Sequence, residues 1–309
     1  MNIERFRVEP SASVDLAEIP TLWRPSSLDD LADEDARRRL RKRVAKRTNE
    51  LDSLQERLHA EGRHRVLVVL QAIDTGGKDG TIRNVFGPLD AQGVRVASFK
   101  VPTEPERAHD YLWRVHAQAP GSGEITVFNR SHYEDVLVVR VHELVEERRW
   151  KRRYRHIRDF ERLLCDEGTT IVKFFLHISA DEQARRLQDR LDSPDKRWKF
   201  ALGDLEERKR WNDYRAAFED MLRETSTRRA PWYVVPADDK AARDLIVSEV
   251  LVRTLRRLNP QFPEPEDALP TTIDAATPID GTADAQIPQP SSPLIAPSRN
   301  EPTRSNPVP

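Results

Sequence analysis

Short runs of apolar and β-branched residues alternate along the chain with longer segments in which apolar residues recur at helical spacing. Near-continuous apolar runs are typical of strands buried on both faces of a parallel sheet, and their alternation with helices is typical of βαβ units. The pattern therefore predicts an α/β fold in which helices cover both faces of a parallel sheet. The predicted strands are residues 65–71, 94–100, 125–129, 170–178 and 232–235.

Helical periodicity is clearest between and after these strands. Residues 105–119 have apolar side chains at helical spacing, and residues 143–167 and 240–258 are long enough for several turns each. Residues 28–61 are highly charged and carry only a sparse apolar stripe. We therefore expect this last segment to form a helix that packs along the edge of the domain.

Residues 181–227 contain two helical patterns on either side of residues 192–203, which read DSPDKRWKFALG. A basic, aromatic-bearing loop between two helices is what a lid over a phosphate site would look like. A solvated helical hairpin without a role in chemistry has the same composition. Composition alone leaves both interpretations open.

The C-terminal part of the sequence differs in composition from the rest. Residues 260–309 contain 12 of the 22 prolines and seven acids against two arginines. Such a segment has too little apolar surface to offset the entropy of ordering it, so we expect a disordered, Pro-rich acidic tail. The whole chain carries a net charge of −1, whereas residues 1–259 carry about +4, which permits a polyanionic partner. The predicted parts are an N-terminal helical extension at residues 1–61, a folded domain at residues 62–259 and the tail.

Cysteine content and the N-terminal sequence indicate an intracellular setting. Cys165 is the single cysteine, which excludes an intramolecular disulfide and argues against a thiolate zinc site. We expect it to be a buried, inert thiol. The first residues, MNIERFRVEP, lack the pattern of a secretion signal, and no apolar run of 18 residues suggests a membrane span. A cytoplasmic protein is the expectation.

The segment from Ala72 to Thr81 reads AIDTGGKDGT, follows the first predicted strand and precedes a helical pattern. A strand, a glycine turn, a lysine and a helix start are the parts that cradle phosphate with backbone N–H groups. A strict GxxxxGK[ST] match fails because Ala72 replaces the first glycine and Asp79 replaces the metal-binding hydroxyl. A plain Gly-Gly turn is the alternative. The candidate phosphate-binding residues here are Gly76, Gly77, Lys78, Asp79, Gly80 and Thr81.

Asp74 adds a reason to expect a divalent cation. An acid within an anion-binding loop would repel its own ligand unless a cation lay between them. An Asx turn or a helix cap is the alternative role for Asp74. Arg83 follows Lys78 by about one helical turn, so it either faces the same anion or lies on the surface.

A second polar cluster, NRSHYED at residues 129–135, follows the third predicted strand, where P-loop proteins deliver an acid to the metal. Asn129 can orient a ligand but cannot neutralise metal charge, so we expect Glu134 to take part of that role. Arg130 is suited to hold a phosphate bidentately. His132 is expected to be a hydrogen-bonding spacer. A polar loop with one capping acid is the alternative for the whole cluster.

Seven segments together resemble a known family. In order, they are LQAIDTGGKDGTI, VASFKVPTEPERAHDYLWRVH, FNRSHYEDVLVVRVHELV, KFFLHIS, SPDKRWKF, DLEERKRW and TSTRRAPWYVVPADDK. Their order from Phe6 to Pro265, without large gaps, closely resembles the polyphosphate kinase 2 family. This ordered set is far more specific than the glycine-containing segment alone.

The resemblance implies a P-loop kinase-like fold, a three-layer αβα sandwich with a helical lid. It implies Mg²⁺-dependent transfer, possible also with Mn²⁺, of phosphoryl groups between inorganic polyphosphate and adenine nucleotides. The NRSHYED variant is similar to the branch that phosphorylates both AMP and ADP, giving ADP and ATP. A homodimer or homotetramer is implied as well.

The resemblance also implies roles for individual residues. Asp74, Lys78, Asn129, Arg130 and Glu134 would be catalytic, with Asp74 and Glu134 holding the metal. Arg83, Lys100, Arg130 and Arg140 would join the glycine-containing segment in binding polyphosphate. The lid residues would be Lys196, Trp198, Lys199 and Arg208.

Two other classes of function compete with this hypothesis. An ATP-dependent P-loop kinase for nucleotides or small molecules is the nearest, and the acid that follows Lys78 counts against it. A nucleic-acid-binding protein that uses basic runs such as residues 148–155 fits less well, because residues 1–259 are only mildly basic. We therefore expect neither a nucleic-acid partner nor a membrane partner.

Overall fold

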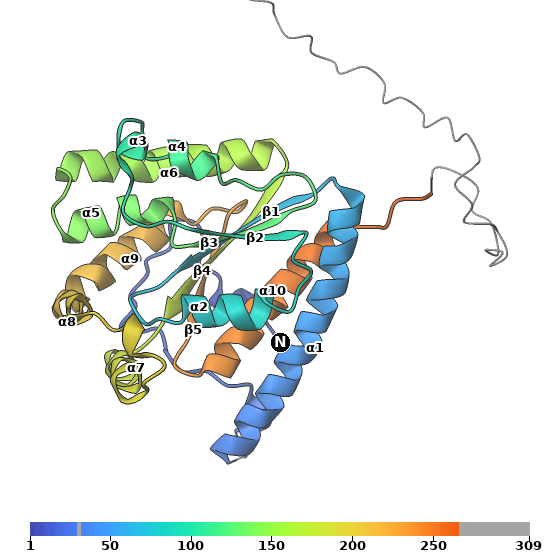
Figure 1. Cartoon of the computed structure of the whole chain (residues 1–309), viewed down its shortest axis with the longest axis horizontal. Helices are drawn as coiled ribbons and strands as arrows, with labels where there is room; N and C mark the ends of the chain where they lie inside the picture. The colour runs from blue at the N-terminus through green and yellow to red at the C-terminus, as the bar shows by residue number, and fades with distance from the viewer. Residues whose placement is uncertain (30–31, 266–309) are drawn as a thin grey trace, which may run out of the picture. The chain divides into compact units, whose positions relative to one another are not determined.

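The computed structural model describes residues 1–29 and 32–265 (Figure 1). Its centre is a five-stranded sheet of order β2-β3-β1-β4-β5, in which every neighbouring pair is parallel. The sequence-based strands are confirmed to within two residues at either end. The strands are β1 (Arg65–Gln71), β2 (Val94–Ser98), β3 (Ile125–Asn129), β4 (Thr169–His177) and β5 (Trp232–Pro236).

Helices cover both faces of this sheet (Figure 1), which confirms the predicted three-layer αβα arrangement. One face is covered by α1 (Asp33–Glu61), α2 (Lys78–Thr81), its continuation η3 (Ile82–Phe86) and α10 (Lys240–Leu258). The other is covered by α4 (Trp113–His116), α5 (Val138–Val141), α6 (Glu147–Asp166) and α9 (Trp211–Thr225). The remaining helices are α3 (Glu104–Arg107), α7 (Ala180–Asp192), α8 (Leu202–Lys209), η1 (Glu4–Phe6), η2 (Ser26–Leu28), η4 (His132–Asp135) and η5 (Arg197–Lys199).

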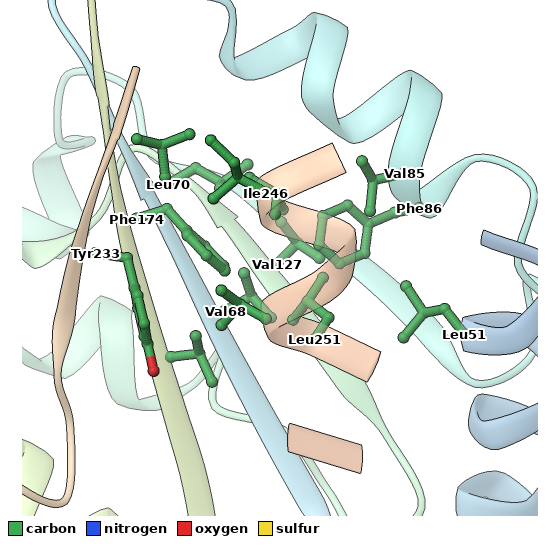
Figure 2. Close-up of a cluster of buried hydrophobic side chains, with 14 of the residues drawn as sticks. Leu51, Val68, Leu70, Val85, Phe86, Val127, Phe174, Tyr233, Ile246 and Leu251 are labelled. Carbon is green, nitrogen blue, oxygen red and sulfur yellow. The ribbon is translucent and has the colours of Figure 1, made fainter. Parts of the chain in front are cut away.

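The pleat of the central strand divides the apolar core into two clusters. Val66, Val68 and Leu70 belong to the cluster under α1 and α10, whereas Leu67 and Val69 belong to the cluster under α6 and α9. All five side chains have no exposed surface, which is why β1 reads as an uninterrupted apolar run. Figure 2 shows the first cluster, in which the sheet meets its helices through Leu51, Val85, Phe86, Ile246 and Leu251.

The N-terminal residues are integrated into the folded domain. Met1–Glu264 form one compact unit. Ile3 and Phe6 are buried in the first apolar cluster, and the amide of Val8 donates to the carbonyl of Trp232 on β5 at 2.9 Å. Of the helix predicted at residues 28–61, the structure confirms Asp33–Glu61 as α1, and Leu28 belongs instead to η2.

The segment predicted as a single helix at residues 105–119 is instead two short helices, α3 and α4. The interruption has a local cause, because the Asp110 carboxylate accepts a hydrogen bond from the amide of Leu112 at 2.9 Å. This Asx-type turn competes with helical hydrogen bonding. The apolar spacing therefore predicted the buried face correctly but not the continuity of the backbone.

The predicted lid, residues 181–227, divides into two structurally different parts. Its last helix, α9, is a core element, since Ala217, Phe218, Met221 and Leu222 are buried against the sheet. Of the elements within residues 181–227, α7, η5 and α8 contribute no residue to the two apolar clusters. The predicted tail lies outside the described residues from residue 266 onward. Within the described ranges, no helix is both long and apolar enough to cross a membrane.

Candidate active site

Two loops meet at the carboxyl edge of the sheet. The glycine loop, residues 72–77, connects β1 to α2, and the arginine loop, residues 130–135, follows β3. β1 and β3 are paired neighbours with Leu70 beside Asn129, so both loops leave the sheet at the same place. In open parallel sheets, ligands bind at this edge.

The glycine loop has a backbone conformation that requires glycine at residue 77. The φ angle of Gly77 is 105°, and a Cβ atom there would overlap the guanidinium of Arg243 from α10. Arg243 is 1% exposed and pairs with Asp244 at 2.7 Å. A buried guanidinium, held by an ion pair with Asp244, thus lies directly behind the loop and limits the residue at position 77 to glycine.

Lys78 is the first residue of α2, at the end of the glycine loop. Its ammonium donates to the carbonyl oxygen of Ala72 at 2.9 Å. Burial lowers the pKa of Lys78, and the nearby carboxylate of Asp74 opposes that shift. An anion bound beside Lys78 would stabilise the ammonium that burial disfavours, so the site is electrostatically suited to a phosphate.

Arg130 lies between two carboxylates at the centre of the site. Its Nη2 atom is 3.1 Å from Oδ1 of Asp74, and its Nη1 atom is 3.8 Å from Oε2 of Glu134. Burial raises the pKa of Glu134, although the Arg130 charge acts in the opposite direction. The φ angle of Arg130 is 63°, a left-handed conformation that is uncommon outside glycine and concentrates at functional sites.

Two of the three residues that depart from a usual P-loop pattern, Asp79 and Asn129, contact each other. The side-chain amide of Asn129 donates to Oδ1 of Asp79 at 2.8 Å. Asp79 stands where a strict motif has a hydroxyl, and Asn129 stands where nucleotide kinases often have an acid. This hydrogen bond joins the end of β3 to the start of α2 and fixes the orientation of the Asn129 amide.

Two cavities meet at Asp74 and Arg130, which line both. The cationic groove, about 760 Å³, lies over the glycine loop and α2. The carboxylate cavity, about 260 Å³, lies over the arginine loop and contains Asp74, Glu134 and Glu207. The two cavities therefore give access to the same pair of side chains from different sides.

The cationic groove is lined by ten lysines and arginines against four aspartates. Such an excess of positive charge in a concave surface favours a polyanion. Four of these cations were not predicted from the sequence, because their helices lie far from the glycine loop along the chain. They are Arg186 and Arg190 on α7, and Lys240 and Arg243 on α10.

Helix α7 supports the glycine loop from behind. The side-chain amide of Gln183 donates to the carbonyl of Asp74 at 3.1 Å, and Arg186 donates to the carbonyl of Thr75 at 3.0 Å. Arg208 on α8 donates to Oε1 of Gln183 at 2.8 Å. These bonds connect α8 through α7 to the loop that carries Asp74.

The carboxylate cavity has one wall that is aromatic and apolar. Tyr214 donates to Glu207 at 2.6 Å, and Nε2 of His142 lies 3.0 Å from Glu207. Leu137, Val138 and Phe218 complete this wall. Sequence reasoning missed this group, since its members come from three helices whose spacing carries no motif.

The chain matches a known protein family over most of its length. A family model described as polyphosphate kinase 2 matches residues 34–263, which is most of the chain. The chain belongs to the polyphosphate kinase 2 family. The family resemblance inferred from the seven segments is thereby confirmed.

Two relatives and one solved structure of the polyphosphate kinase 2 family are similar to this chain over more than nine tenths of their own length. The AMP/ADP-polyphosphate phosphotransferase of Meiothermus ruber is 56% identical over 266 residues, covering 86% of this chain and 97% of that protein. The ADP-polyphosphate phosphotransferase of Rhodopseudomonas palustris is 43% identical over 273 residues, covering 84% and 92%. The crystal structure of polyphosphate kinase 2 from Arthrobacter aurescens TC1 matches with a TM-score of 0.79 and 41% identity, covering 86% of this chain and 93% of that one.

Most site residues inferred from the polyphosphate kinase 2 motifs line the cationic groove. They are Asp74, Gly76, Gly77, Lys78, Asp79, Gly80, Arg83, Lys100, Asn129, Arg130, Lys196 and Lys199. Glu134 lines the carboxylate cavity.

Four inferred residues line neither cavity. Thr81 is buried, and its hydroxyl donates to the carbonyl of Gly77 at 3.2 Å. Arg140 pairs with Asp220 at 2.6 Å and lies over the Trp150 ring. Trp198 is 78% exposed, whereas Arg208 acts through Gln183. Thr81, Arg140 and Arg208 thus contact protein groups outside the two cavities.

The donor atoms at the centre of the site fit a hard divalent cation. Asp74 and Glu134 present carboxylate oxygens to the carboxylate cavity, and their side chains are 33% and 19% exposed. In the described part of the chain, no group of three or more acids, histidines or cysteines could hold a metal by itself. Mg²⁺ is commonly bound by one or two carboxylates together with substrate phosphates, so a pair of acids suffices.

Proposed function

We propose that this chain transfers phosphoryl groups from inorganic polyphosphate to AMP and ADP, forming ADP and ATP in a reversible reaction. The observation that carries the proposal is the meeting of a cationic groove and a carboxylate cavity at Asp74 and Arg130. Relatives that are 56% and 43% identical are named for transfer between polyphosphate and AMP or ADP, which supports the same substrates here.

The division between the two cavities suggests how donor and acceptor are placed. The cationic groove has the charge to hold polyphosphate, with Lys78 and Arg83 from α2 and η3, and Lys196 and Lys199 from the segment at η5. The carboxylate cavity has an aromatic wall that suits a nucleotide. Arg130, which lines both, would contact the phosphates of both substrates where they meet.

Phosphoryl transfer requires little covalent chemistry from the protein. The acceptor is already an anionic phosphate, so no side chain needs to remove a proton. The contribution of Lys78, Arg130 and the groove cations is to align the two phosphates and to stabilise charge on the transferred group. His132 fits this account, because it has no exposed surface and cannot reach either cavity.

The metal requirement is part of the proposal. Asp74 and Glu134 would hold Mg²⁺, with Mn²⁺ as a substitute, and the bound ion would neutralise phosphate charge. Asn129 would orient a substrate oxygen without adding negative charge.

A donor exchange separates this function from that of an ATP-dependent kinase. Purified protein is incubated with Mg²⁺ and AMP, and either long-chain polyphosphate or ATP is supplied as the donor. Rapid formation of ADP is expected with polyphosphate and only slow formation with ATP. Faster transfer from ATP than from polyphosphate would favour the rival kinase.

Replacement of Lys78 tests the position of the active site. Lys78→Ala should lower kcat/KM for transfer at least about 100-fold, as expected when a donor to the transferred group is removed. Its far-UV circular dichroism should be unchanged. Lys42→Ala, which alters an exposed lysine on α1, is the matched control and should retain normal turnover. Near-normal turnover in Lys78→Ala would place the chemistry elsewhere.

The proposal also includes the cellular compartment and the oligomeric state. We expect a cytoplasmic homodimer or homotetramer, as the family resemblance implies. Light scattering coupled to size-exclusion chromatography would give the mass directly, and a mass equal to that of one chain would contradict the expectation.

A further inference from the structure

A second positively charged cavity lies beside the cationic groove. The outer cavity, about 460 Å³, is formed between the segment after β2 and helix α6. Its charged lining consists of five arginines and two histidines against three acids. These residues are Arg107, Arg114, Arg149, Arg152, Arg153, His109, His156, Glu106, Asp110 and Asp135.

Some of the arginines that line the outer cavity form ion pairs with its acids, and others do not. Arg153 pairs with Asp135 at 3.0 Å, and Arg114 lies 3.6 Å from Glu106. Arg149 and Arg152 are exposed, and within residues 1–29 and 32–265 neither has a carboxylate within ion-pairing distance. Two guanidinium groups one helical turn apart on α6 therefore face a hollow without a counter-ion from the described protein.

The outer cavity adjoins the active site through consecutive residues. Lys100 and Val101 line the cationic groove, and Pro102 lines the outer cavity. The residues that line the two cavities are therefore consecutive in the chain at this point, with neighbouring Cα atoms about 3.8 Å apart. Arg114 reinforces the boundary by donating to the carbonyl of Lys100 at 2.8 Å.

We propose that the outer cavity is a distal subsite for inorganic polyphosphate, holding the part of a long chain that extends past Lys100. The proposal rests on the proposed function, because it assumes that the donor occupies the cationic groove. A linear polyanion can bridge the two regions, and the second contact raises affinity by an effective-concentration effect. A short chain, which ends within the groove, gains nothing from the outer cavity.

The test compares chain lengths in a variant of the two unpaired arginines. Arg149→Ala/Arg152→Ala should raise KM for long-chain polyphosphate about three- to tenfold, the range for two exposed charge contacts. Its kcat and its KM for short-chain polyphosphate should stay unchanged. Arg155→Ala/Arg162→Ala removes two exposed arginines from another face of α6 and should leave every value unchanged.

Three outcomes would overturn the proposal. Unchanged KM for long chains would show that the outer cavity does not hold the donor. An equal rise for short and long chains would indicate a general effect on the groove. Free nucleotides share the phosphate chemistry, so weaker equilibrium binding of ATP with normal KM for long chains would assign the cavity to a nucleotide. Transfer from short chains by the unaltered protein tests the proposed function separately.

Discussion

Lys173 and Glu161 form a buried ion pair beneath the arginine loop. Nζ of Lys173 lies 2.6 Å from Glu161, 2.9 Å from the Tyr133 hydroxyl and 2.8 Å from the Thr225 carbonyl. Burial lowers the pKa of Lys173, and the Glu161 charge opposes that shift. Tyr133 also donates to Glu161 at 2.6 Å, so the pair anchors the loop that carries Arg130 and Glu134. Buried charges are tolerated only when their partners are satisfied in this way.

Cys165 gives a residue-level test that is independent of the active site. Burial raises the pKa of its thiol to about 11. The thiolate is the reactive form, so alkylation at pH 8 should be about 100-fold slower than for an ordinary thiol. The rate should rise about tenfold per pH unit, because each unit multiplies the small thiolate fraction by ten. Iodoacetamide labelling followed by mass spectrometry measures both effects.

Protein unfolded in urea is the control for this measurement, since its thiol should react at the ordinary rate. Equal rates in the folded and unfolded states would contradict the burial of Cys165. Cys165 is half-buried on α6, so the predicted full burial is wrong, and the inertness of its thiol stays a prediction.

At the scale of an element, the glycine loop depends on Gly77. Gly77→Ala would force a Cβ atom into the Arg243 guanidinium and strain a φ angle of 105°. The expected result is a fall in melting temperature together with a loss of transfer of at least about tenfold, because the loop must shift. Differential scanning fluorimetry and initial rates are the measurements.

Gly203→Ala supplies the matched control on α8. A Cβ atom at Gly203 would meet nothing within 4 Å, and alanine is the better helix former. This variant should retain activity and be as stable as the unaltered protein or slightly more stable. If Gly77→Ala behaved like Gly203→Ala, the close approach of Arg243 to the loop would be wrong.

Helices and strands could be predicted from the sequence where the local pattern of apolar residues was enough to determine the secondary structure. The strands were found because parallel strands buried on both faces read as apolar runs, as β1 does. The helix expected at residues 105–119 was wrong because the Asp110 side chain competes for a backbone amide, and apolar spacing does not register such a turn. The predicted lid, residues 181–227, included α9, which packs in the core. The apolar periodicity of a core helix is the same as that of a helix on the surface of a lid, so the sequence pattern alone does not distinguish the two.

At the scale of the whole molecule, site residues that belong to one contiguous motif could be predicted from the sequence. Site residues that come from distant segments and meet only in the folded structure could not. The glycine and arginine loops are contiguous segments, so their residues could be named in advance. Arg186 and Arg243 reach the same groove from helices that follow β4 and β5. Net charge gave little guidance, because a value of −1 for the chain coexists with a groove lined by ten cations.

The central claim is that phosphate passes directly from polyphosphate in the groove to a nucleotide in the neighbouring cavity. The most direct test is a ³¹P NMR time course of the full chain with Mg²⁺, AMP and long-chain polyphosphate, with no ATP added. ADP should appear first and ATP second, and one polyphosphate linkage should disappear for each nucleotide linkage formed. Loss of polyphosphate linkages to free phosphate without formation of ADP would contradict the account.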